Sequence, residues 1–167
     1  MLNKPFLFCI LGLTLMGCHK KDFFEGAIFC DFGAEKMIQN KEYSFFPQQD
    51  STSFESNKPY DIYLIVRYNR DCEIKKLPLN IEVTQLNFDE IIRKEVTLNL
   101  FDKNDNPIGK GNYSLFETTT LIGTEQYPDE KYCVTVSSPL NVTSGIVSIG
   151  IGWKESDPSN AVDDLKL

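Results

Sequence analysis

The strongest β-strand pattern in the chain is the stretch Tyr60-Asp61-Ile62-Tyr63-Leu64-Ile65-Val66-Arg67-Tyr68. Its residues Ile62, Leu64 and Val66 alternate onto one face of the predicted strand. Its residues Tyr63 and Ile65 make the opposite face apolar as well. A strand that is apolar on both faces is typical of the middle of a sheet. We therefore predict that a sheet is built around residues 60–68.

Shorter alternating segments repeat the β pattern on both sides of this stretch. They are centred on residues 43–46, 79–84, 91–100, 113–121, 132–136 and 147–153. Turn-forming residues separate them, for example Asp102 to Pro107 and Tyr127 to Glu130. Residues 34–38 fit either a helical turn or an irregular lead-in strand. Roughly seven strands at intervals of about ten residues predict an all-β fold, an antiparallel β-sandwich of Ig-like or jelly-roll-like type.

The amino-terminal residues have the pattern of a lipoprotein signal peptide. An apolar run from Phe6 to Met16 follows Lys4 and is too short for a membrane span, which needs about 20 residues. It ends in Leu15-Met16-Gly17-Cys18, the order of a bacterial lipobox. We predict cleavage after Gly17 and lipidation of Cys18 with fatty acyl chains such as palmitate. Several chains on one residue give stable anchoring.

The predicted division of the chain follows from this anchor. Residues 1–17 are the cleaved signal peptide, 18–41 the lipid anchor and lead-in tether, 42–154 the β-sandwich domain, and 155–167 a polar tail. Cleavage leaves 150 of the 167 residues, a single-domain length. Loss of Lys4 changes the formal net charge from −7 to −8. An acidic chain without a Lys/Arg cluster argues against nucleic acid or an anionic lipid surface as ligand.

Three cysteines remain after Cys18. They are Cys30, Cys72 and Cys133, and they would lie in an oxidising compartment. Three thiols allow at most one internal bridge. Buried free cysteine is a common small hydrophobic residue, so we expect no obligatory disulfide.

Motifs for catalysis or metal binding are incomplete. Residues 102–106 open like a calcium loop, but Pro107 replaces the required glycine and Tyr113 the bidentate glutamate. Residues 109–111 lack the rest of a phosphate loop. The sole histidine, His19, adjoins the predicted lipid site, which argues against a histidine-based triad or metal site in the domain. We expect no enzyme activity, catalytic residue, metal or cofactor, although a carboxylate pair for glycoside hydrolysis stays open because its spacing is spatial.

Two features could relate to sugars. The aromatic candidates for stacking a glycan are Tyr60, Tyr63, Tyr68 and Trp153, although most of them alternate as core residues. The triplet Asp50-Ser51-Thr52 fits a short motif for O-glycosylation of exported Bacteroidetes proteins at Ser51 or Thr52. A plain polar loop explains the same three residues.

Arg67 and the turn at residues 103–106 are the other residues that we single out. Arg67 ends a strand with two apolar faces, so its charge must reach solvent or a carboxylate. We expect it to be structural. The turn from Lys103 to Asn106 mainly sets hairpin geometry, and a contact role for it is the alternative.

The order of these features resembles the GldH family of gliding-motility lipoproteins of the Bacteroidetes. The lipobox comes first, followed by the tyrosine-rich strand that ends in Arg67. A hairpin then leads to Ile108-Gly109-Lys110-Gly111, and the closing strand runs from Gly145 to Ile151. The resemblance covers about Tyr43 to Trp153. Two departures are Asn106-Pro107, where the family commonly has a tryptophan, and the single aromatic residue after Arg67.

The resemblance implies a non-enzymatic structural or assembly component of a gliding-motility or surface-protein export apparatus. Its partners would be other envelope proteins of that complex. The absence of aspartate after Cys18 favours the outer membrane, with the periplasmic face preferred, while Lys21-Asp22 is half of a surface-export signal. The alternative is a lipoprotein binding module for glycans of a polysaccharide-uptake system.

Overall fold

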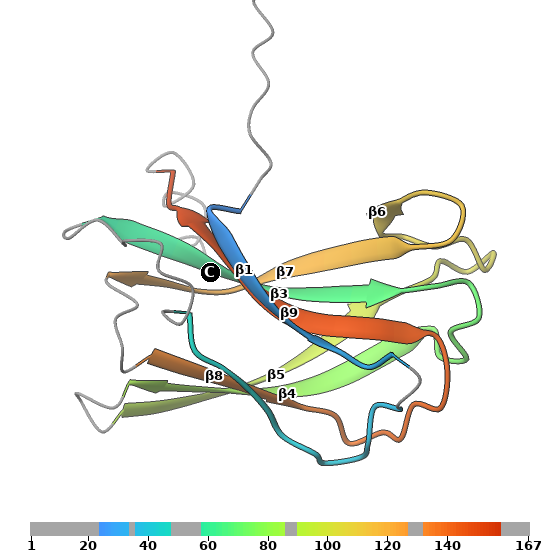
Figure 1. The fold of residues 1–167 in the computed structure, drawn as a ribbon, viewed down its shortest axis with the longest axis horizontal. Helices are drawn as coiled ribbons and strands as arrows, with labels where there is room; N and C mark the ends of the chain where they lie inside the picture. Colours follow the sequence, from blue (N-terminus) through green and yellow to red (C-terminus); the bar gives the residue numbers. More distant parts are fainter. Residues whose placement is uncertain (1–23, 34–35, 48–57, 86–89, 127–131, 158–167) are drawn as a thin grey trace, which may run out of the picture.

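The computed structural model describes residues 24–33, 36–47, 58–85, 90–126 and 132–157. These residues form strands and connecting turns in two antiparallel sheets that pack face to face (Figure 1), which confirms the predicted all-β sandwich. In the described ranges, no helix is long and apolar enough to cross a membrane. The strands are β1 (Gly26–Asp31), β2 (Tyr43–Phe45), β3 (Pro59–Tyr68), β4 (Lys76–Gln85), β5 (Glu90–Asn99), β6 (Lys110–Gly111), β7 (Phe116–Gln126), β8 (Tyr132–Ser137) and β9 (Ile146–Glu155).

The order of the strands is that of a jelly roll. One sheet has the order β1-β9-β3-β7-β6, and the other has β2-β8-β4-β5. The strands pair as nested hairpins: β4 with β5, β3 with β7, β2 with β8 and β1 with β9. With the two-residue β6 set aside, eight strands in two sheets wound in this way form a jelly roll, not an Ig-like sandwich.

Strand β3 is central, as the sequence predicts. It pairs along its length with β7 on one side and β9 on the other. Ile62, Leu64 and Val66 face the second sheet and are fully buried. Ile65 faces away from that sheet and is fully buried too, because Phe24 and Phe29 cover this part of the outer face. Both apolar faces of β3 are therefore shielded from solvent.

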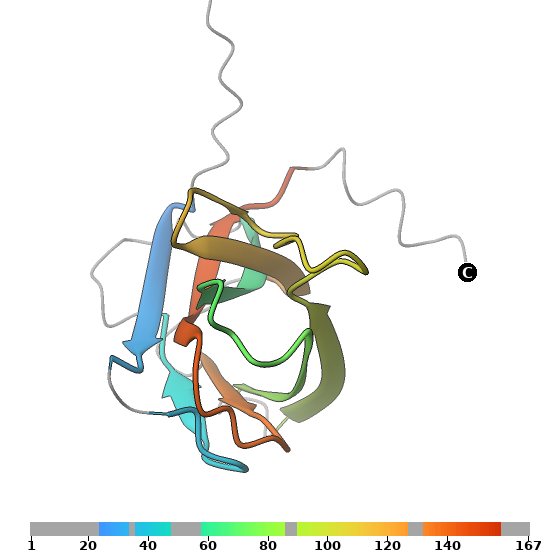
Figure 2. The same ribbon diagram turned by 90° about the vertical axis from the view of Figure 1, so that its right-hand side faces the viewer.

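The core lies between the two sheets, whose face-to-face arrangement is seen end-on in Figure 2. Trp153 and Tyr68 are its largest fully buried side chains. Burial of apolar area at about 25 cal/mol per Å² is the main force that holds the sheets together. The alternation that places these residues inside also leaves the outward face of the four-stranded sheet polar.

Strand β1 lies in the segment that the sequence assigned to the tether. Residues 26–31 pair with β9 in the register Gly26↔Trp153 to Asp31↔Ser148, so the sheet begins well before residue 42. Phe29 is apolar although it faces outward. Residues 26–31 therefore do not show the alternation of apolar and polar side chains that would predict a strand. Phe29 packs over Gly150, where an added Cβ would come within 2.4 Å of its ring. The sequence of β1 alone does not show that a glycine on the neighbouring strand leaves room for Phe29, so the strand could not be predicted from it.

Two other boundaries differ from expectation. The prediction of a strand starting at Tyr113 is wrong, since β7 begins at Phe116 and Tyr113 is 95% exposed in a turn. The described ranges contain nine strands where the sequence predicts roughly seven, and the two additional strands are β1 and β6. The turn predicted at residues 127–130 lies outside the described residues.

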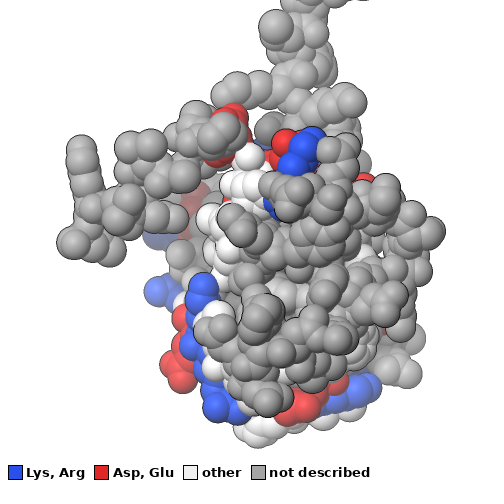
Figure 3. All heavy atoms as spheres, turned by 90° about the vertical axis from the view of Figure 1, so that its left-hand side faces the viewer, with Lys and Arg blue, Asp and Glu red and all other residues white. Residues whose placement is uncertain are grey.

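The first and last parts of the described chain lie side by side. The Glu25 N–H donates to the Trp153 carbonyl (2.8 Å), and the Glu155 N–H donates to the Glu25 carboxylate (3.0 Å). Figure 3 views this end of the sandwich, where described acidic and basic side chains adjoin one another at the rim. The described chain therefore begins beside the end of β9.

Candidate functional site

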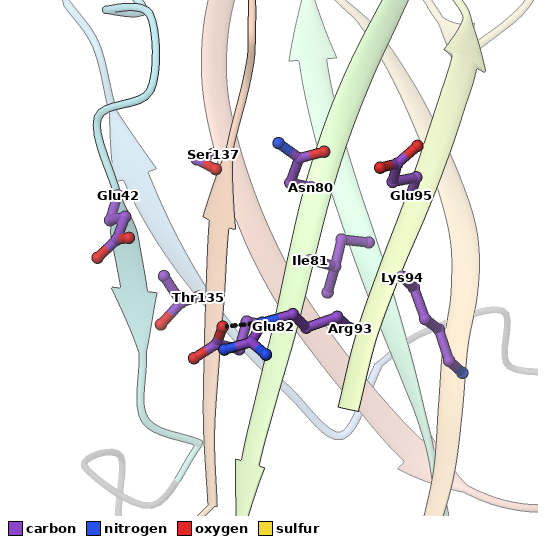
Figure 4. Close-up of a pocket in the computed structure, with 9 residues that line it drawn as sticks. All are labelled: Glu42, Asn80, Ile81, Glu82, Arg93, Lys94, Glu95, Thr135 and Ser137. Atoms are coloured by element: carbon purple, nitrogen blue, oxygen red, sulfur yellow. Dashed lines mark hydrogen bonds and ion pairs between the residues drawn. The ribbon is translucent and has the colours of Figure 1, made fainter. Parts of the chain in front are cut away.

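The outward face of the four-stranded sheet carries a polar groove of about 550 Å³. It crosses β8, β4 and β5 and reaches the residue before β2 (Figure 4). The lining residues are Glu42, Asn80, Ile81, Glu82, Arg93, Lys94, Glu95, Thr135 and Ser137.

Alternation along the strands explains why the groove is polar. On β4, Ile81 is buried in the core, while Asn80 and Glu82 on either side of it point outward. On β8, Thr135 and Ser137 alternate with buried valines. The pairing of Asn80 with Ser137 and of Glu82 with Thr135 brings these side chains together across the two strands.

The charges of the groove are partly neutralised. The Arg93 guanidinium donates to the Glu82 carboxylate at 2.9 Å, as the dashed line in Figure 4 marks. The Arg93 side chain is 72% exposed, so solvent screens this ion pair. Glu42 and Glu95 add two carboxylates. Such a surface can accept and donate hydrogen bonds to a partner or ligand. Within the described part of the chain, no three His, Cys, Asp or Glu residues are placed to hold a metal ion.

The four aromatic candidates do not form a stacking platform. Tyr60, Tyr68 and Trp153 are 3%, 0% and 1% exposed and belong to the core between the sheets. Tyr63 is half-buried on the outer face of the other sheet, where its ring contacts Phe24 at a centroid distance of 5.4 Å. Their burial confirms the prediction that most of the four aromatic residues belong to the core, and it excludes a sugar-stacking role for these three.

Arg67 has two partners on the outer face of the five-stranded sheet. Its Nε donates to the Glu117 carboxylate at 2.9 Å, across the pairing of β3 with β7. Its guanidinium carbon lies 3.8 Å from the centre of the Phe29 ring, a cation–π geometry. The sequence indicated that a carboxylate or solvent must meet this charge. The residues that do so, Glu117 and Phe29, could be identified only from the register of the sheet.

The calcium-like segment is a hairpin turn. One Asp102 carboxylate oxygen accepts hydrogen bonds from the N–H groups of Asn104 (2.8 Å) and Asn106 (2.9 Å). The Asn106 backbone and side-chain N–H groups, in that order, lower the pKa of Asp102. Asp105 has a φ of 63° and pairs with Lys75 at 2.5 Å. The two carboxylates therefore stabilise the hairpin: Asp102 bonds to N–H groups of the turn, and Asp105 forms an ion pair with Lys75.

A second carboxylate joins two loops at the same end. The Glu73 carboxylate accepts from the Thr143 N–H (2.5 Å) and hydroxyl (2.8 Å). The Thr143 N–H is the largest contribution to the lowered pKa of Glu73. Next to it, Gly145 packs its Cα against the Cys72 backbone at a φ of 87°. These contacts fix the loop before β9 on the loop before β4.

The three remaining cysteines lie on different elements of the described chain and are not joined by a disulfide. Cys30 lies on β1, Cys72 in the loop after β3 and Cys133 on β8. Burial raises the pKa of the Cys72 thiol. Each cysteine is half-buried, in keeping with the role of a small hydrophobic residue.

One buried carboxyl group was not identified from the sequence. Asp61 is 3% exposed, and its Oδ1 accepts from the hydroxyls of Thr124 (2.7 Å) and Ser156 (2.8 Å). An aspartate inside an apolar strand was the available signal. Asp61 joins β3, β7 and the end of β9, so its role here is structural.

Two predicted sites lie outside the described residues. They are the lipidation site Cys18 and the glycosylation candidates Ser51 and Thr52, and each stays a prediction. The sole histidine, His19, lies outside the described residues as well.

Comparison with known proteins supports one family. The model of a family described as "GldH lipoprotein" matches residues 38–152, which are 115 of the 167 residues. The matched part runs from just before β2 to near the end of β9 and leaves out β1. A search of the curated proteins found no match.

Proposed function

The chain belongs to the GldH lipoprotein family, and on this premise we propose that it is a gliding-motility lipoprotein that acts by protein contact. It is a non-enzymatic structural or assembly component of the apparatus that moves or exports surface proteins. Its partners are other envelope proteins of that apparatus. The family match is the observation that carries the proposal.

The anchor and location are part of this proposal. Cys18 carries the acyl chains, and the domain is held at the outer membrane with the periplasmic face preferred. The lipobox at residues 15–18 and the absence of aspartate after Cys18 support this arrangement. The segment from Cys18 to Phe24 spans six residue steps, about 20 Å when fully extended, so the domain stays close to the membrane.

The roles of the carboxylates support a contact function. Glu82 is paired with Arg93, Glu117 with Arg67, Asp102 with its own turn and Glu73 with Thr143. Each of these carboxylates is hydrogen-bonded to another part of the domain. Their role is therefore to hold strands and turns together, as expected in a domain that acts by contact. The polar groove on the four-stranded sheet then offers hydrogen-bonding groups to a partner surface.

A deletion strain complemented with variants tests this proposal. The wild-type gene should restore movement and export of surface adhesins. Ser137→Arg, which places bulk and charge in the groove, should fail to restore them and should lose crosslinked partners in intact envelopes. Thr119→Arg is the matched control, because Thr119 is exposed on the outer face of the other sheet.

A glycan-binding module is the second candidate. The carboxylate, amide and hydroxyl groups of the groove favour it, since these groups bind sugar hydroxyls. A deletion strain with normal adhesin movement and export, together with a pure domain that binds polysaccharide, would replace the first proposal by this one.

A further inference from the structure

Strand β5 is a long edge of the four-stranded sheet, with ten residues, whereas the edge strands β1 and β2 have six and three. In the other sheet, the two-residue β6 pairs only with Phe116 and Glu117 and leaves the rest of β7 open as a second long edge. Among the described strands, β5 pairs with β4 alone. It runs along the right-hand side of the molecule in Figure 2. Natural sheets keep edges short because unpaired N–H and C=O groups are a template for another strand.

One hydrogen bond shows which residues of β5 direct their backbone N–H and C=O groups to the free edge. Leu100 N–H donates to the Lys75 carbonyl at 2.8 Å, and the pairs that follow, such as Leu77↔Leu98, keep the same register. In an antiparallel ladder, hydrogen-bonded pairs recur at every second residue. Even-numbered residues of β5 therefore bond to β4. The odd-numbered residues direct their N–H and C=O groups to the free edge: Ile91, Arg93, Glu95 and Thr97.

Lys94 disfavours the pairing of an apolar strand with this edge. It is opposite Ile81, so its side chain starts on the inward face of β5. Its Nζ donates to the Ile122 carbonyl at 2.6 Å, which links β5 to β7 in the other sheet at the point where the β3–β7 register shifts. An inward-pointing lysine on an edge strand opposes the addition of an apolar strand, because the ammonium group, which now bonds to a neutral carbonyl and is exposed to solvent, would lose that solvent without gaining a carboxylate.

The charge pattern also opposes pairing with a second copy of the chain. When two identical strands pair antiparallel within one continuous sheet, odd residues face odd residues and even residues face even ones. A pair centred on residue 93 or 95 places Arg93 or Glu95 opposite its own counterpart, and like charges directly opposite each other are destabilising. A pair centred on residue 94 places Arg93 opposite Glu95, but Lys94 then faces Lys94 on the inward side of the strand, where solvent screens the repulsion less. A heterologous strand has no such restriction.

We propose that the β5 edge binds an extended segment of another protein as an added antiparallel strand. The segment carries carboxylates opposite Arg93 and Lys94 and a basic residue opposite Glu95. Because the pairing is antiparallel, the segment read from its amino end has a basic residue opposite Glu95, then an acidic residue opposite Lys94, then an acidic residue opposite Arg93. Backbone hydrogen bonds to the odd-numbered residues supply affinity, and the charge triplet supplies selectivity. This inference rests on the proposed contact function and names the kind of partner.

Residue-resolved amide hydrogen exchange on the mature lipidated chain in detergent micelles tests the proposal. The probe is a capped ten-residue peptide of alternating valine and threonine with a central lysine–glutamate–aspartate triplet. The control peptide has the reversed charges, glutamate–lysine–lysine. With the probe alone, exchange at Ile91, Arg93, Glu95 and Thr97 should slow about tenfold, while even-numbered amides are protected from the start.

Two variants sharpen this experiment. Thr97→Pro removes one outward N–H and should weaken binding of the probe, whereas Thr97→Ala keeps that N–H and should bind as the wild type does. Lys94→Gln should reduce the discrimination between the two peptides. An unchanged far-UV spectrum shows that each variant is folded.

Three results would overturn the proposal. They are no protection of the odd-numbered amides by the probe, equal protection by both peptides, and protection that grows with protein concentration without peptide, which indicates self-pairing. The deletion strain reports separately on the contact function: impaired adhesin movement together with any of these results would reject the added strand and leave the proposed function standing.

Discussion

The hydroxyl of Tyr68 donates a hydrogen bond of 2.6 Å to the backbone carbonyl of Leu100, inside the core. The same hydroxyl accepts from the Gly109 N–H at 2.9 Å. One side chain at the end of β3 thus fixes both arms of the hairpin that connects the two sheets between β5 and β6. Gly109 is required there because an added Cβ would come within 2.6 Å of the Glu117 carbonyl.

Tyr68→Phe should therefore lower the free energy of unfolding by about 1–3 kcal/mol, since it leaves buried backbone groups without a partner. Urea denaturation of the chain measures this loss. Tyr63→Phe is the control, because the Tyr63 hydroxyl makes only a 3.4 Å bond to Asp61 on a half-buried face. Equal losses for both variants would show that the Leu100 contact has no special role.

Arg67→Ala should lower the free energy of unfolding by about 1 kcal/mol. It removes a partly exposed ion pair with Glu117 and the stacking on Phe29, each of which contributes about 0.5–1 kcal/mol. A double-mutant cycle with Glu117→Gln separates the two contributions. An unchanged melting temperature together with loss of captured partners would instead give Arg67 a binding role.

Gly145→Ala should be more costly than Gly33→Ala. Both glycines have a positive φ, 87° and 54°, so each substitution brings backbone strain of about 1 kcal/mol or more. A Cβ at Gly145 would also lie 2.0 Å from the Cys72 Cα, whereas nothing lies within 4 Å at Gly33. Thermal unfolding of the two variants compares them, and equal shifts would exclude the Cys72 contact as a cause.

The hairpin turn should make stability depend on pH in the acid range. Hydrogen bonds from Asn106 lower the pKa of Asp102 in the folded state, so the folded protein holds this proton less tightly than the unfolded chain does. The resulting stabilisation is fully present above the unfolded pKa of about 4 and is lost as pH falls through the lower folded pKa. The stability difference between wild type and Asp102→Asn should therefore shrink below about pH 4.

Unfolding midpoints measured across this range test the sign. Glu73→Gln should show the same trend, because hydrogen bonds from Thr143 lower the pKa of Glu73. A difference from wild type that stays constant with pH in both variants would contradict the assignment.

Cys18→Ala should release the protein from the membrane without unfolding it. Cys18 is the predicted lipid acceptor, and it precedes Gly26, the first residue of β1. Detergent partitioning should place the wild type in the detergent phase and the variant in the aqueous phase. Cys30→Ala should partition as the wild type does. A Cys18→Ala protein that remains with the membrane would reject the lipobox.

The residues of β3 show how far the sequence alone can lead. Alternation of apolar side chains is a local property, and it predicted the central strand, the sandwich and the burial of most aromatic residues. It did not predict β1, because Phe29 packs in space that Gly150 leaves on a strand more than a hundred residues away. The candidate groove was equally hidden, since Asn80, Glu82 and Thr135 meet only through the β4–β8 register.

The sequence by itself determined which faces of the strands are apolar, because side-chain direction repeats every two residues wherever a strand forms. It also gave the lipobox and the family resemblance, which are read from consecutive residues. Only the tertiary structure decided that the strands nest as a jelly roll, that Glu117 and Phe29 contact Arg67, and that β5 lies at an open edge of its sheet. Those outcomes depend on which strands pair, and pairing is set by packing between residues distant in the chain.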